Sequence, residues 1–367
     1  MVTLNRVARR ILLLITDLEI GGTPTVVREL ATRLNDPAGG VEIEVACLAK
    51  WGPVAEQIRD AGVRVTALEA RSAADFPATV WRLTRLVRRG SFDTVFSFLI
   101  HANTIAAAAK PFCRGVRFIQ SIQTTQPRPR WHWWLQRIVH PAAGRMVVPS
   151  PSAAAVAHER SDVPPGKIVV ISNAIDPAAF ARSPVPGQQP TPYPIGFIGR
   201  LDPVKRLDWL LAEMVLVEQM RPGAVHLHLF GDGVERGHLR REIERLGLRR
   251  IVTMHGAVAR PQEALSQIGL LVLRSEAEGF GLVLIEAMAA GVPVIGTNVP
   301  GIRDVIVDGE NGLLVSYASA KGMAAAILRA VEQPALRHDL IEGGLQAVRG
   351  RFSWESVLPQ YRQLLEI

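Results

Sequence analysis

The chain has 367 residues, of which 48% are hydrophobic and 21% charged. This composition is typical of a globular protein and excludes wholesale disorder, and the length favours two domains over one compact core. The two cysteines, Cys47 and Cys113, lie far apart without CxxC spacing. Their spacing argues against a disulfide framework or a zinc site and favours a reducing compartment.

The N-terminus has three arginines before a short apolar run, Ile11–Ile15, which Asp17 and Glu19 follow. A signal peptide needs a longer apolar region and a small-residue cleavage site. No stretch of the sequence approaches the roughly 18 apolar residues of a membrane-spanning helix. We therefore expect a soluble, cytoplasmic protein.

The net charge of +8 is concentrated in the first half of the chain. Residues 1–185 contain 23 Lys and Arg against 14 Asp and Glu, and the segment from Trp81 to Arg137 contains ten basic residues and one acid, Asp93. Arginine-rich codon usage explains part of this excess, but it would affect both halves equally. The asymmetry favours contact of the N-terminal half with an anionic membrane or an anionic acceptor.

Short Val/Ile/Leu runs alternate with helical patterns through both halves. The strands expected from them are 11–15, 42–48, 64–68, 94–98, 117–122, 146–148, 168–171, 194–198, 225–230, 251–254, 270–273, 293–296 and 312–315. Continuous apolar runs of this kind are typical of parallel sheets covered on both faces. We predict an α/β protein with two doubly wound domains separated by a cleft, whose ligands lie beyond the carboxyl ends of the strands.

A proline-rich stretch divides the two halves. Pro184–Pro194 contains five prolines and Gly187 without a periodic pattern, which is typical of a linker. The predicted domains are residues 1–175 and 176–351.

Two groups of residues in the first half follow predicted strands. Gly21 and Gly22 precede an expected helix that runs from Thr23 as N-cap through Leu34, and they let the backbone approach a phosphate or an acceptor. A plain tight turn is the alternative. His101 follows strand 94–98 and precedes an expected helix at 103–110, where it is either a structural cap or a catalytic group.

In the second half, two cations follow the strand 194–198. Asp202 and Pro203 form an N-cap and an N1 position, so Lys205 is expected in the first helical turn and Arg200 in the loop beside it. Cations at a helix N-terminus bind anions and would stabilise a diphosphate leaving group. The alternative for Lys205 is a solvated lysine.

A buried helix is predicted at Gly281–Ala290, because its sequence is apolar on every face. Glu286 lies in its middle and needs hydrogen-bond donors, which ribose hydroxyls would supply. Glu278 precedes the helix, where backbone N–H groups are available to a ligand. Alternatively, Glu286 pairs with a structural arginine and Glu278 is a solvated acid.

At this point a family resemblance becomes specific. The segment EGFGLVLIEAMAAGVPVIGTNVPGIRDVIVDGENGLLV, residues 278–315, resembles the donor-site signature of the retaining glycosyltransferases of family four (glycosyl transferases group 1 type), which have the GT-B fold of two Rossmann-like domains. The resemblance implies that Glu278 faces the transferred sugar and Glu286 the nucleotide ribose. It also implies that the backbone amides of four residues bind sugar and diphosphate: Gly279, Phe280, Gly281 and Leu282.

The same resemblance extends along most of the chain. It implies that Arg200 and Lys205 bind the phosphates and that His101, in FSFLIHANTIAAAAK, faces the donor sugar. It also implies that a C-terminal helix within 352–367 crosses back to the first domain. The family commonly has a Gly-Gly pair like Gly21-Gly22, but usually has Glu where this chain has Pro24, so no side-chain role is carried over there. Further substrate-binding positions are expected at Gly231, Asp232, His255 and Asn173.

The resemblance implies transfer of a sugar, with retained anomeric configuration, from a UDP- or GDP-sugar to a hydroxyl acceptor. We expect that acceptor to be a glycan or a lipid-linked or polysaccharide intermediate of cell-envelope glycan synthesis. No DxD motif is present, so we expect no metal and no cofactor. A cluster at Trp131–Trp134, with arginines around it, is either the edge of a core helix or a surface that contacts a membrane or stacks on sugars.

Two alternatives remain open. One is a GT-B-like nucleotide-sugar epimerase or hydrolase. The other is a non-enzymatic nucleic-acid-binding protein, because the sequence pI is about 10.1. Against nucleic acid as a partner, the sequence has no binding motif and its charge is confined to one half.

Overall fold

The structure is a computed structural model that describes residues 9–181, 191–258 and 260–367. The chain forms two compact units, Met1–Asn173 with Val357–Ile367, and Ala174–Ser356. Most of the predicted linker lies outside the described residues.

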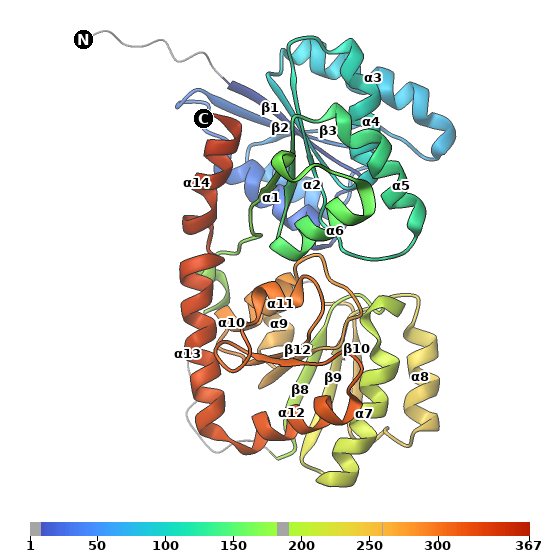
Figure 1. The fold of residues 1–367 in the computed structure, drawn as a ribbon, viewed down its shortest axis with the longest axis vertical. Helices are drawn as coiled ribbons and strands as arrows, with labels where there is room; N and C mark the ends of the chain where they lie inside the picture. The colour runs from blue at the N-terminus through green and yellow to red at the C-terminus, as the bar shows by residue number, and fades with distance from the viewer. Residues whose placement is uncertain (1–8, 182–190, 259) are drawn as a thin grey trace, which may run out of the picture. The chain divides into compact units, whose positions relative to one another are not determined.

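The sheet of the first unit has seven parallel strands in the order β3-β2-β1-β4-β5-β6-β7 (Figure 1). Their bounds are β1 Arg9–Ile15, β2 Val41–Cys47, β3 Arg64–Ala67, β4 Thr94–Phe98, β5 Arg117–Ser121, β6 Arg145–Val148 and β7 Ile168–Val170. The sequence order places the topological switch point between β1 and β4, where the strand order reverses.

Six helices of this unit connect the strands: α1 Gly22–Leu34, α2 Pro53–Asp60, α3 Phe76–Gly90, α4 Ile100–Ala109, α5 Arg130–Val139 and α6 Pro151–Ser161. Short 3₁₀ turns lie at η1 Ala73–Asp75, η2 Lys110–Phe112, η3 His140–Ala142 and η4 Pro165–Lys167. The helices α1 and α2 pack against each other, and α3, α4, α5 and α6 pack in that order. Because right-handed crossovers on opposite sides of a switch point cover opposite faces, these two groups cover the two faces of the sheet.

The second unit repeats the architecture with six parallel strands in the order β10-β9-β8-β11-β12-β13. Their bounds are β8 Tyr193–Ile198, β9 Val225–Phe230, β10 Val252–Gly256, β11 Leu270–Leu273, β12 Val294–Thr297 and β13 Leu313–Val315. The helices are α7 Leu207–Met220, α8 Arg236–Arg245, α9 Pro261–Leu265, α10 Leu282–Ala289, α11 Ile302–Val305, α12 Ala320–Glu332 and α13 Pro334–Arg351, with 3₁₀ turns η5 Pro177–Phe180 and η6 Pro203–Lys205. Its switch point lies between β8 and β11.

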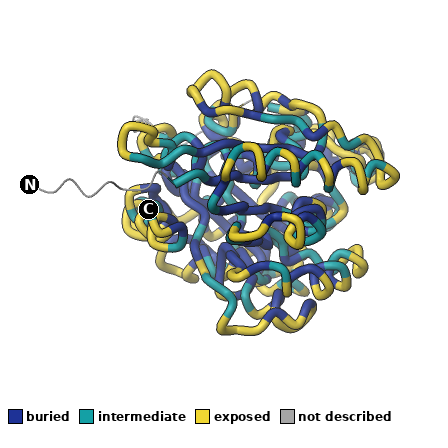
Figure 2. The backbone as a smooth tube through the Cα atoms, turned by 90° about the horizontal axis from the view of Figure 1, so that it is seen from above, coloured by how far each residue is buried: buried dark blue, intermediate teal, exposed yellow. Residues whose placement is uncertain are grey.

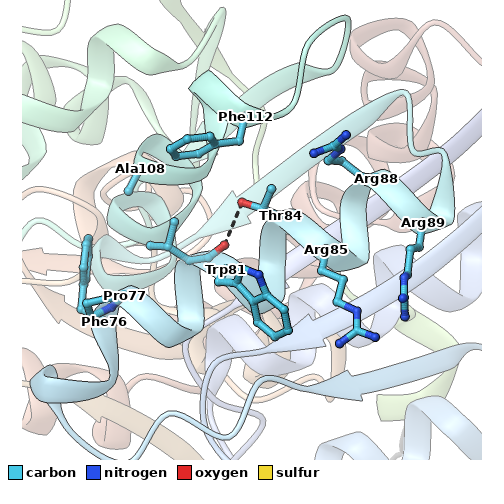
Figure 3. A pocket seen from close by; sticks show the side chains of 10 residues that line it. Phe76, Pro77, Trp81, Thr84, Arg85, Arg88, Arg89, Ala108 and Phe112 are labelled. Atoms are coloured by element: carbon cyan, nitrogen blue, oxygen red, sulfur yellow. Dashed lines mark hydrogen bonds between the residues drawn. The ribbon is translucent and has the colours of Figure 1, made fainter.

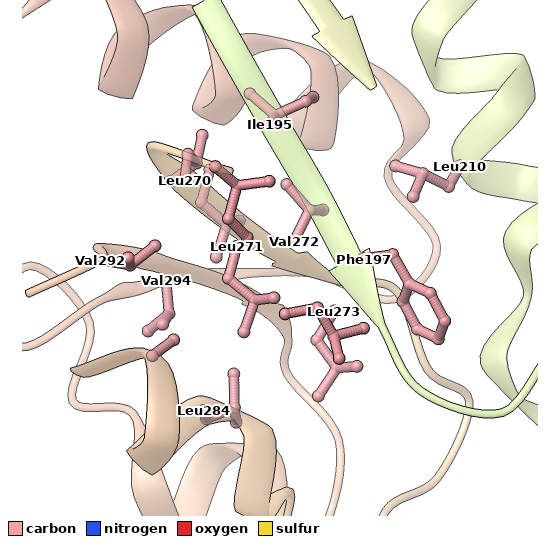
Figure 4. Packing of buried hydrophobic residues seen from close by; sticks show 14 of the residues in the cluster. Ile195, Phe197, Leu210, Leu270, Leu271, Val272, Leu273, Leu284, Val292 and Val294 are labelled. Atoms are coloured by element: carbon pink, nitrogen blue, oxygen red, sulfur yellow. The ribbon is translucent and has the colours of Figure 1, made fainter. Parts of the chain in front are cut away.

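The core of each unit is built from these strands and the helix faces above them. Figure 2 shows buried backbone in the interior and exposed residues on the outer helices and loops. In the second unit, Leu284 of α10 packs with Leu271 and Val294 of the adjacent strands (Figure 4). The apolar helix predicted at 281–290 is therefore confirmed as a buried helix, with slightly different ends.

The last helix, α14 Trp354–Leu365, carries the chain from the second unit into the first. Within the first unit, Tyr361 is fully buried, 6.4 Å between ring centroids from Phe96. The guanidinium of Arg117 donates to the Leu364 carbonyl at 2.8 Å and pairs with Glu366. These contacts fasten the end of the chain to the sheet of the first unit.

Three helix starts differ from the prediction. The first helix begins at Gly22 with Gly21 as N-cap, so Thr23 is not the cap. The helix α4 begins at Ile100, which puts His101 in its first turn rather than before it. Lys205 lies in the 3₁₀ turn η6, and α7 begins only at Leu207, after a left-handed residue. In each case a backbone turn, and not side-chain capping, decides where the helix starts.

Candidate functional site

The loops that flank the switch point of the second unit bring two predicted residues together. One loop follows β8 and contains Lys205, and the other follows β11 and contains Glu278. The Glu276 N–H donates to the Val204 carbonyl at 2.8 Å, which joins the two loops directly. The Lys205 ammonium forms an ion pair with the Glu278 carboxylate. Both side chains are half-buried, so this pair is shielded from solvent more than a surface salt bridge is.

Glu278 also accepts a hydrogen bond from the Ser275 hydroxyl at 2.8 Å. The Ser275 carbonyl in turn accepts from the buried Thr297 hydroxyl at 2.6 Å, which links the loop to the end of β12. A Cβ at Gly301 would lie 2.2 Å from the Glu278 carbonyl oxygen, so glycine is needed there. The Glu278 carboxylate is thus held by Lys205 and Ser275, while the backbone of its loop is held by Thr297 and lies against Gly301.

The start of α10 offers backbone donors next to this pair. Gly281 is the N-cap, in a left-handed conformation with φ of 83°, and no side chain caps the helix. No hydrogen bond is recorded from the N–H groups of Gly279, Phe280 or Gly281 within the described residues. The first helical residue, Leu282, has no intrahelical acceptor either, as in any helix. The Phe280 ring is buried against Phe352, so a ligand can use only its backbone. Together these donors form an anion-binding arrangement.

Arg200, the other predicted phosphate ligand, is placed differently. Its side chain is exposed and pairs with Asp202 at 2.7 Å. The structure therefore brings Lys205 and Glu278 together and leaves Arg200 at the solvent-exposed side of the same loop.

The Glu286 carboxylate lies on α10 without a protein partner. Among the described residues its carboxylate forms no hydrogen bond or ion pair, so none of the described arginines is the structural partner considered as the alternative. Burial alone raises the pKa of Glu286 to about 7. A half-buried carboxylate of this kind is available to hydrogen-bond donors from a ligand, as ribose hydroxyls are.

The raised pKa of Glu286 has a measurable consequence for stability. The carboxyl is protonated up to about pH 7 in the folded state, but only up to its ordinary value of 4.5 when unfolded. Wild-type stability therefore falls as pH rises between those values. We expect Glu286→Gln to be increasingly stabilising relative to wild type from pH 5 to pH 8, by up to about 3 kcal/mol. Thermal unfolding at both pH values checks this, with exposed Glu276→Gln as the control, and a pH-independent difference would contradict it.

The loop after β9 packs against the loop after β8. A Cβ at Gly231, where φ is 144°, would lie 1.8 Å from the Gly199 carbonyl oxygen, so only glycine fits. Asp232 is exposed, accepts from the Gly233 N–H and pairs with Arg236 at 2.6 Å. These contacts place Gly231 and Asp232 beside the phosphate-binding loop expected at Gly199–Lys205.

His255 is the penultimate residue of β10, close to the same loops. Its ring stacks on Phe230 at 4.3 Å between centroids, and its Nε2 lies 2.9 Å from Nδ1 of His228. Burial, with His226 and His255 close by, lowers the pKa of His228 to about 4. The exposed His255 ring thus lies on a flat aromatic surface at the carboxyl end of the sheet, which suits stacking of a base.

In the first unit, Gly21–Gly22 and His101 follow the two strands at the switch point, β1 and β4. Leu99, the N-cap of α4, has φ of 72°, a strained conformation for leucine that turns the chain sharply into the helix. His101 is exposed, with its ring 5.8 Å from Trp131 and 5.7 Å from His132, edge to face. His101 therefore lies at the carboxyl edge of the sheet, as predicted. Its neighbours Trp131 and His132 belong to the aromatic cluster that was considered separately in the sequence.

A buried hydrogen-bond network holds α4 against the sheet. Asn103 accepts from the Ser97 hydroxyl at 2.8 Å and donates to the Ser121 carbonyl and to Gln136 of α5. Its polar partners are all buried, so the orientation of α4 is fixed. Asn173, at the end of the unit, donates to Gln123 at 3.2 Å, while its buried Oδ1 has no partner among the described residues.

One residue that was not predicted anchors the start of the loop after β11, which contains Glu278. Arg274, fully buried, donates to Glu213 of α7 at 2.7 Å and to the Tyr317 carbonyl at 2.6 Å. Its guanidinium also lies 4.8 Å from the Trp209 ring centroid and 5.0 Å from that of Tyr317. The sequence indicated this role only by an arginine directly after a predicted strand, because its partners Glu213 and Tyr317 lie far away in the chain.

In the described part of the chain, no cluster of His, Cys, Asp and Glu is arranged to hold a metal ion. No helix there has the length and apolar character needed to cross a bilayer.

Comparison with known proteins identifies the family. Residues 20–179 match the model for Glycosyltransferase Family 4, and residues 182–347 match the model for Glycosyl transferases group 1. The two matches together take in most of the chain. The chain belongs to the group 1, family 4 glycosyltransferases. The resemblance stated from the sequence is confirmed.

Curated relatives agree with this membership. The chain is 28% identical to a D-inositol 3-phosphate glycosyltransferase of Arthrobacter sp., over 92% of this chain and 88% of that protein. It is 32% identical to a poly(ribitol-phosphate) alpha-N-acetylglucosaminyltransferase of Staphylococcus aureus over 46% of this chain. That match spans only 34% of the relative, and the next two curated relatives are matched over 42% and 46% of their lengths.

The fold is shared with solved glycosyltransferase structures. Anabaena HepE, solved in complex with UDP and glucose, superposes with a TM-score of 0.85 at 19% identity, covering 98% of this chain and 99% of that one. The predicted GT-B fold is therefore confirmed.

Proposed function

We propose that this glycosyltransferase moves a sugar from a UDP- or GDP-sugar to a hydroxyl of a lipid-linked or polysaccharide intermediate of cell-envelope glycan synthesis. The transfer retains the anomeric configuration, needs no metal ion, and occurs in the cytoplasm at the inner face of the membrane. One observation carries the proposal: Lys205, Glu278 and the free N–H groups at the start of α10 converge at the switch point of the second unit.

The second unit binds the donor in this proposal. Glu286 accepts hydrogen bonds from the ribose, and the N–H groups of Gly279–Leu282 bind the diphosphate together with Lys205 and Arg200. As the glycosidic bond breaks, negative charge grows on the diphosphate, and donors already aimed at it stabilise the transition state more than the ground state. Glu278 is positioned for the transferred sugar. Lys205 gives up part of its contact with Glu278 when it binds phosphate.

The remaining residues have supporting roles. His255 and the loop of Gly231 and Asp232 border the base and phosphates. In the first unit, Gly21 and Gly22 let the acceptor or a phosphate approach the backbone, and His101 contacts the donor sugar. Asn173 serves as a further substrate contact through its buried Oδ1. The HepE structures with UDP and glucose, and the names of the bacterial relatives, support a nucleotide-sugar donor and an envelope-type acceptor.

A panel of UDP- and GDP-sugars, incubated with the protein in EDTA, tests the proposal through slow release of nucleotide. We expect release from at least one donor without metal. Release that occurs only with Mg²⁺ or Mn²⁺ would overturn metal independence. Epimerised donor, or free sugar that accumulates despite an added acceptor, would favour the epimerase or hydrolase alternative. No release from any donor under any condition would overturn the proposal.

A further inference from the structure

The helix α3 is amphipathic, and it also carries large apolar side chains outside the face that packs into the core. Its inner face packs into the core through Thr79, Leu83 and Val87. Its sequence, FPATVWRLTRLVRRG, contains four arginines and no acid. On the outer side, the Phe76 side chain is 41% exposed and that of Trp81 60% exposed. Large aromatic groups in water next to unpaired cations mark a surface that contacts something else.

A groove of about 920 Å³ runs along this outer side, between α3 and the end of α4 with η2 (Figure 3). The Phe112 ring, 62% exposed, forms its opposite wall. Arg85 lies over the Trp81 ring at 5.2 Å, and Arg88 and Arg89 line the groove toward the end of the helix. A second hollow of about 430 Å³ shares Trp81, Arg85 and Arg89, so these side chains stand on a ridge between two depressions.

The neighbouring helices extend this surface. The helices α3, α4 and α5 pack side by side on one face of the first unit. On α5, Trp131, Trp134 and Ile138 follow the i, i+3, i+7 spacing of one helix stripe, and all three are exposed. The aromatic cluster noted in the sequence is therefore a second exposed apolar row, on the helix that packs against α4, and Trp133 of that cluster is buried in the core.

The charge around the groove is strongly positive. No ion pair is recorded for Arg85, Arg88 or Arg89 among the described residues. The one acid between residues 81 and 137 is Asp93, and its carboxylate accepts from the backbone N–H of Arg10. These cations favour an anionic partner, and the exposed aromatic side chains favour an apolar partner. A bilayer with anionic lipids supplies both at its headgroup boundary.

We propose that this surface, the α3–η2 groove with Phe76, Trp81 and Phe112 and the arginines Arg85, Arg88 and Arg89, docks on an anionic lipid bilayer. The aromatic rings enter the boundary between headgroups and acyl chains, and the guanidinium groups bind lipid phosphates. The inference deepens the proposed function by assigning its membrane contact to particular residues. It uses no residue of the proposed donor site.

Vesicle co-sedimentation tests the docking surface. We expect the wild-type protein to bind vesicles of phosphatidylglycerol and phosphatidylcholine, and to bind vesicles of pure phosphatidylcholine at least ten-fold less. Trp81→Ser/Phe112→Ser and Arg88→Glu/Arg89→Glu should each weaken binding to the anionic vesicles at least ten-fold. Trp51→Ala is the matched apolar control, because Trp51 is 44% exposed with Arg59 over its ring at 5.3 Å, outside the groove. Arg240→Glu/Arg241→Glu on α8 is the matched charge control.

The outcomes that overturn the assignment are distinct. Wild-type protein that binds no vesicles, or groove variants that bind as wild type does, would overturn it. Loss only in Trp131→Ser/Trp134→Ser would move the contact to α5. Salt-sensitive binding of a DNA oligonucleotide without vesicle binding, or a dimer that Trp81→Ser dissociates, would identify another partner. Nucleotide release from a UDP-sugar without vesicles should be unchanged in the groove variants, so failure of the docking surface is separable from failure of the proposed function.

Discussion

Replacing Lys205 with alanine is expected to lower kcat/KM for the nucleotide-sugar by about 10²- to 10³-fold. The ammonium is half-buried at the switch point, where its charge is screened less than at the surface. In the proposed mechanism it stabilises charge that appears on the diphosphate only as the bond breaks, so most of the loss should be in kcat. Steady-state nucleotide release with varied donor separates kcat from KM.

Variants of its neighbours sharpen this test. Glu278→Gln should also reduce kcat strongly. Arg200→Ala should cost about ten-fold, because its charge is exposed and acts through water. Lys205→Arg keeps the charge and should retain more activity than Lys205→Ala. If the Lys205–Glu278 pair is only structural, both neutral variants will lower the melting temperature while the folded enzyme keeps its wild-type kcat/KM.

The central strands of both sheets were predictable because they are buried on both faces. All thirteen predicted strands are present in the described residues, with ends that differ by at most two positions. Continuous runs such as Leu12–Ile15 are almost completely buried, so no competing pattern exists for them. The strand order, and with it the switch points, was not predicted, because it depends on which strands pair in the folded sheet.

The helix starts were less predictable, because they depend on strained backbone. Leu99 and Arg206 adopt φ values of 72° and 49°, which local preference disfavours for residues other than glycine. A sequence prediction that searches for a capping side chain therefore places the start of α4 too late. The tertiary contacts of each loop, and not its own residues, stabilise these turns.

In the candidate site, too, features that depend on local sequence were predicted, and features that depend on tertiary contacts were not. Glu278, Glu286 and Lys205 were predicted as site residues because carboxylates and cations stand out beside an apolar helix. The pairing of Lys205 with Glu278 was not found, since it depends on how two loops 73 residues apart in sequence meet. Arg274 was not predicted for a related reason. It is buried by α7 and by the segment around Tyr317, and nothing in the sequence near Arg274 indicates that these segments pack on it.

Replacing that arginine should have the largest effect on stability. We expect Arg274→Ala to destabilise the second unit by about 3–5 kcal/mol, because it removes one partner of a fully buried ion pair. Two acceptors, the Glu213 carboxyl and the Tyr317 carbonyl, lose their donor. At about 2–4 °C per kcal/mol, the melting temperature should fall by about 10 °C.

The reason for this cost can be separated from the value of the pair itself. Burial raises the pKa of Glu213 to about 7, although Arg274 beside it lowers that pKa. The cost of desolvating the carboxylate therefore offsets much of its attraction to the guanidinium. Glu213→Leu/Arg274→Met removes both charges at similar volume and should recover most of the lost stability, as buried pairs replaced by apolar residues often do. If the double variant is as unstable as Arg274→Ala, then the contacts of the guanidinium with Trp209, Tyr317 and the Tyr317 carbonyl, rather than the charge left on Glu213, explain the lost stability.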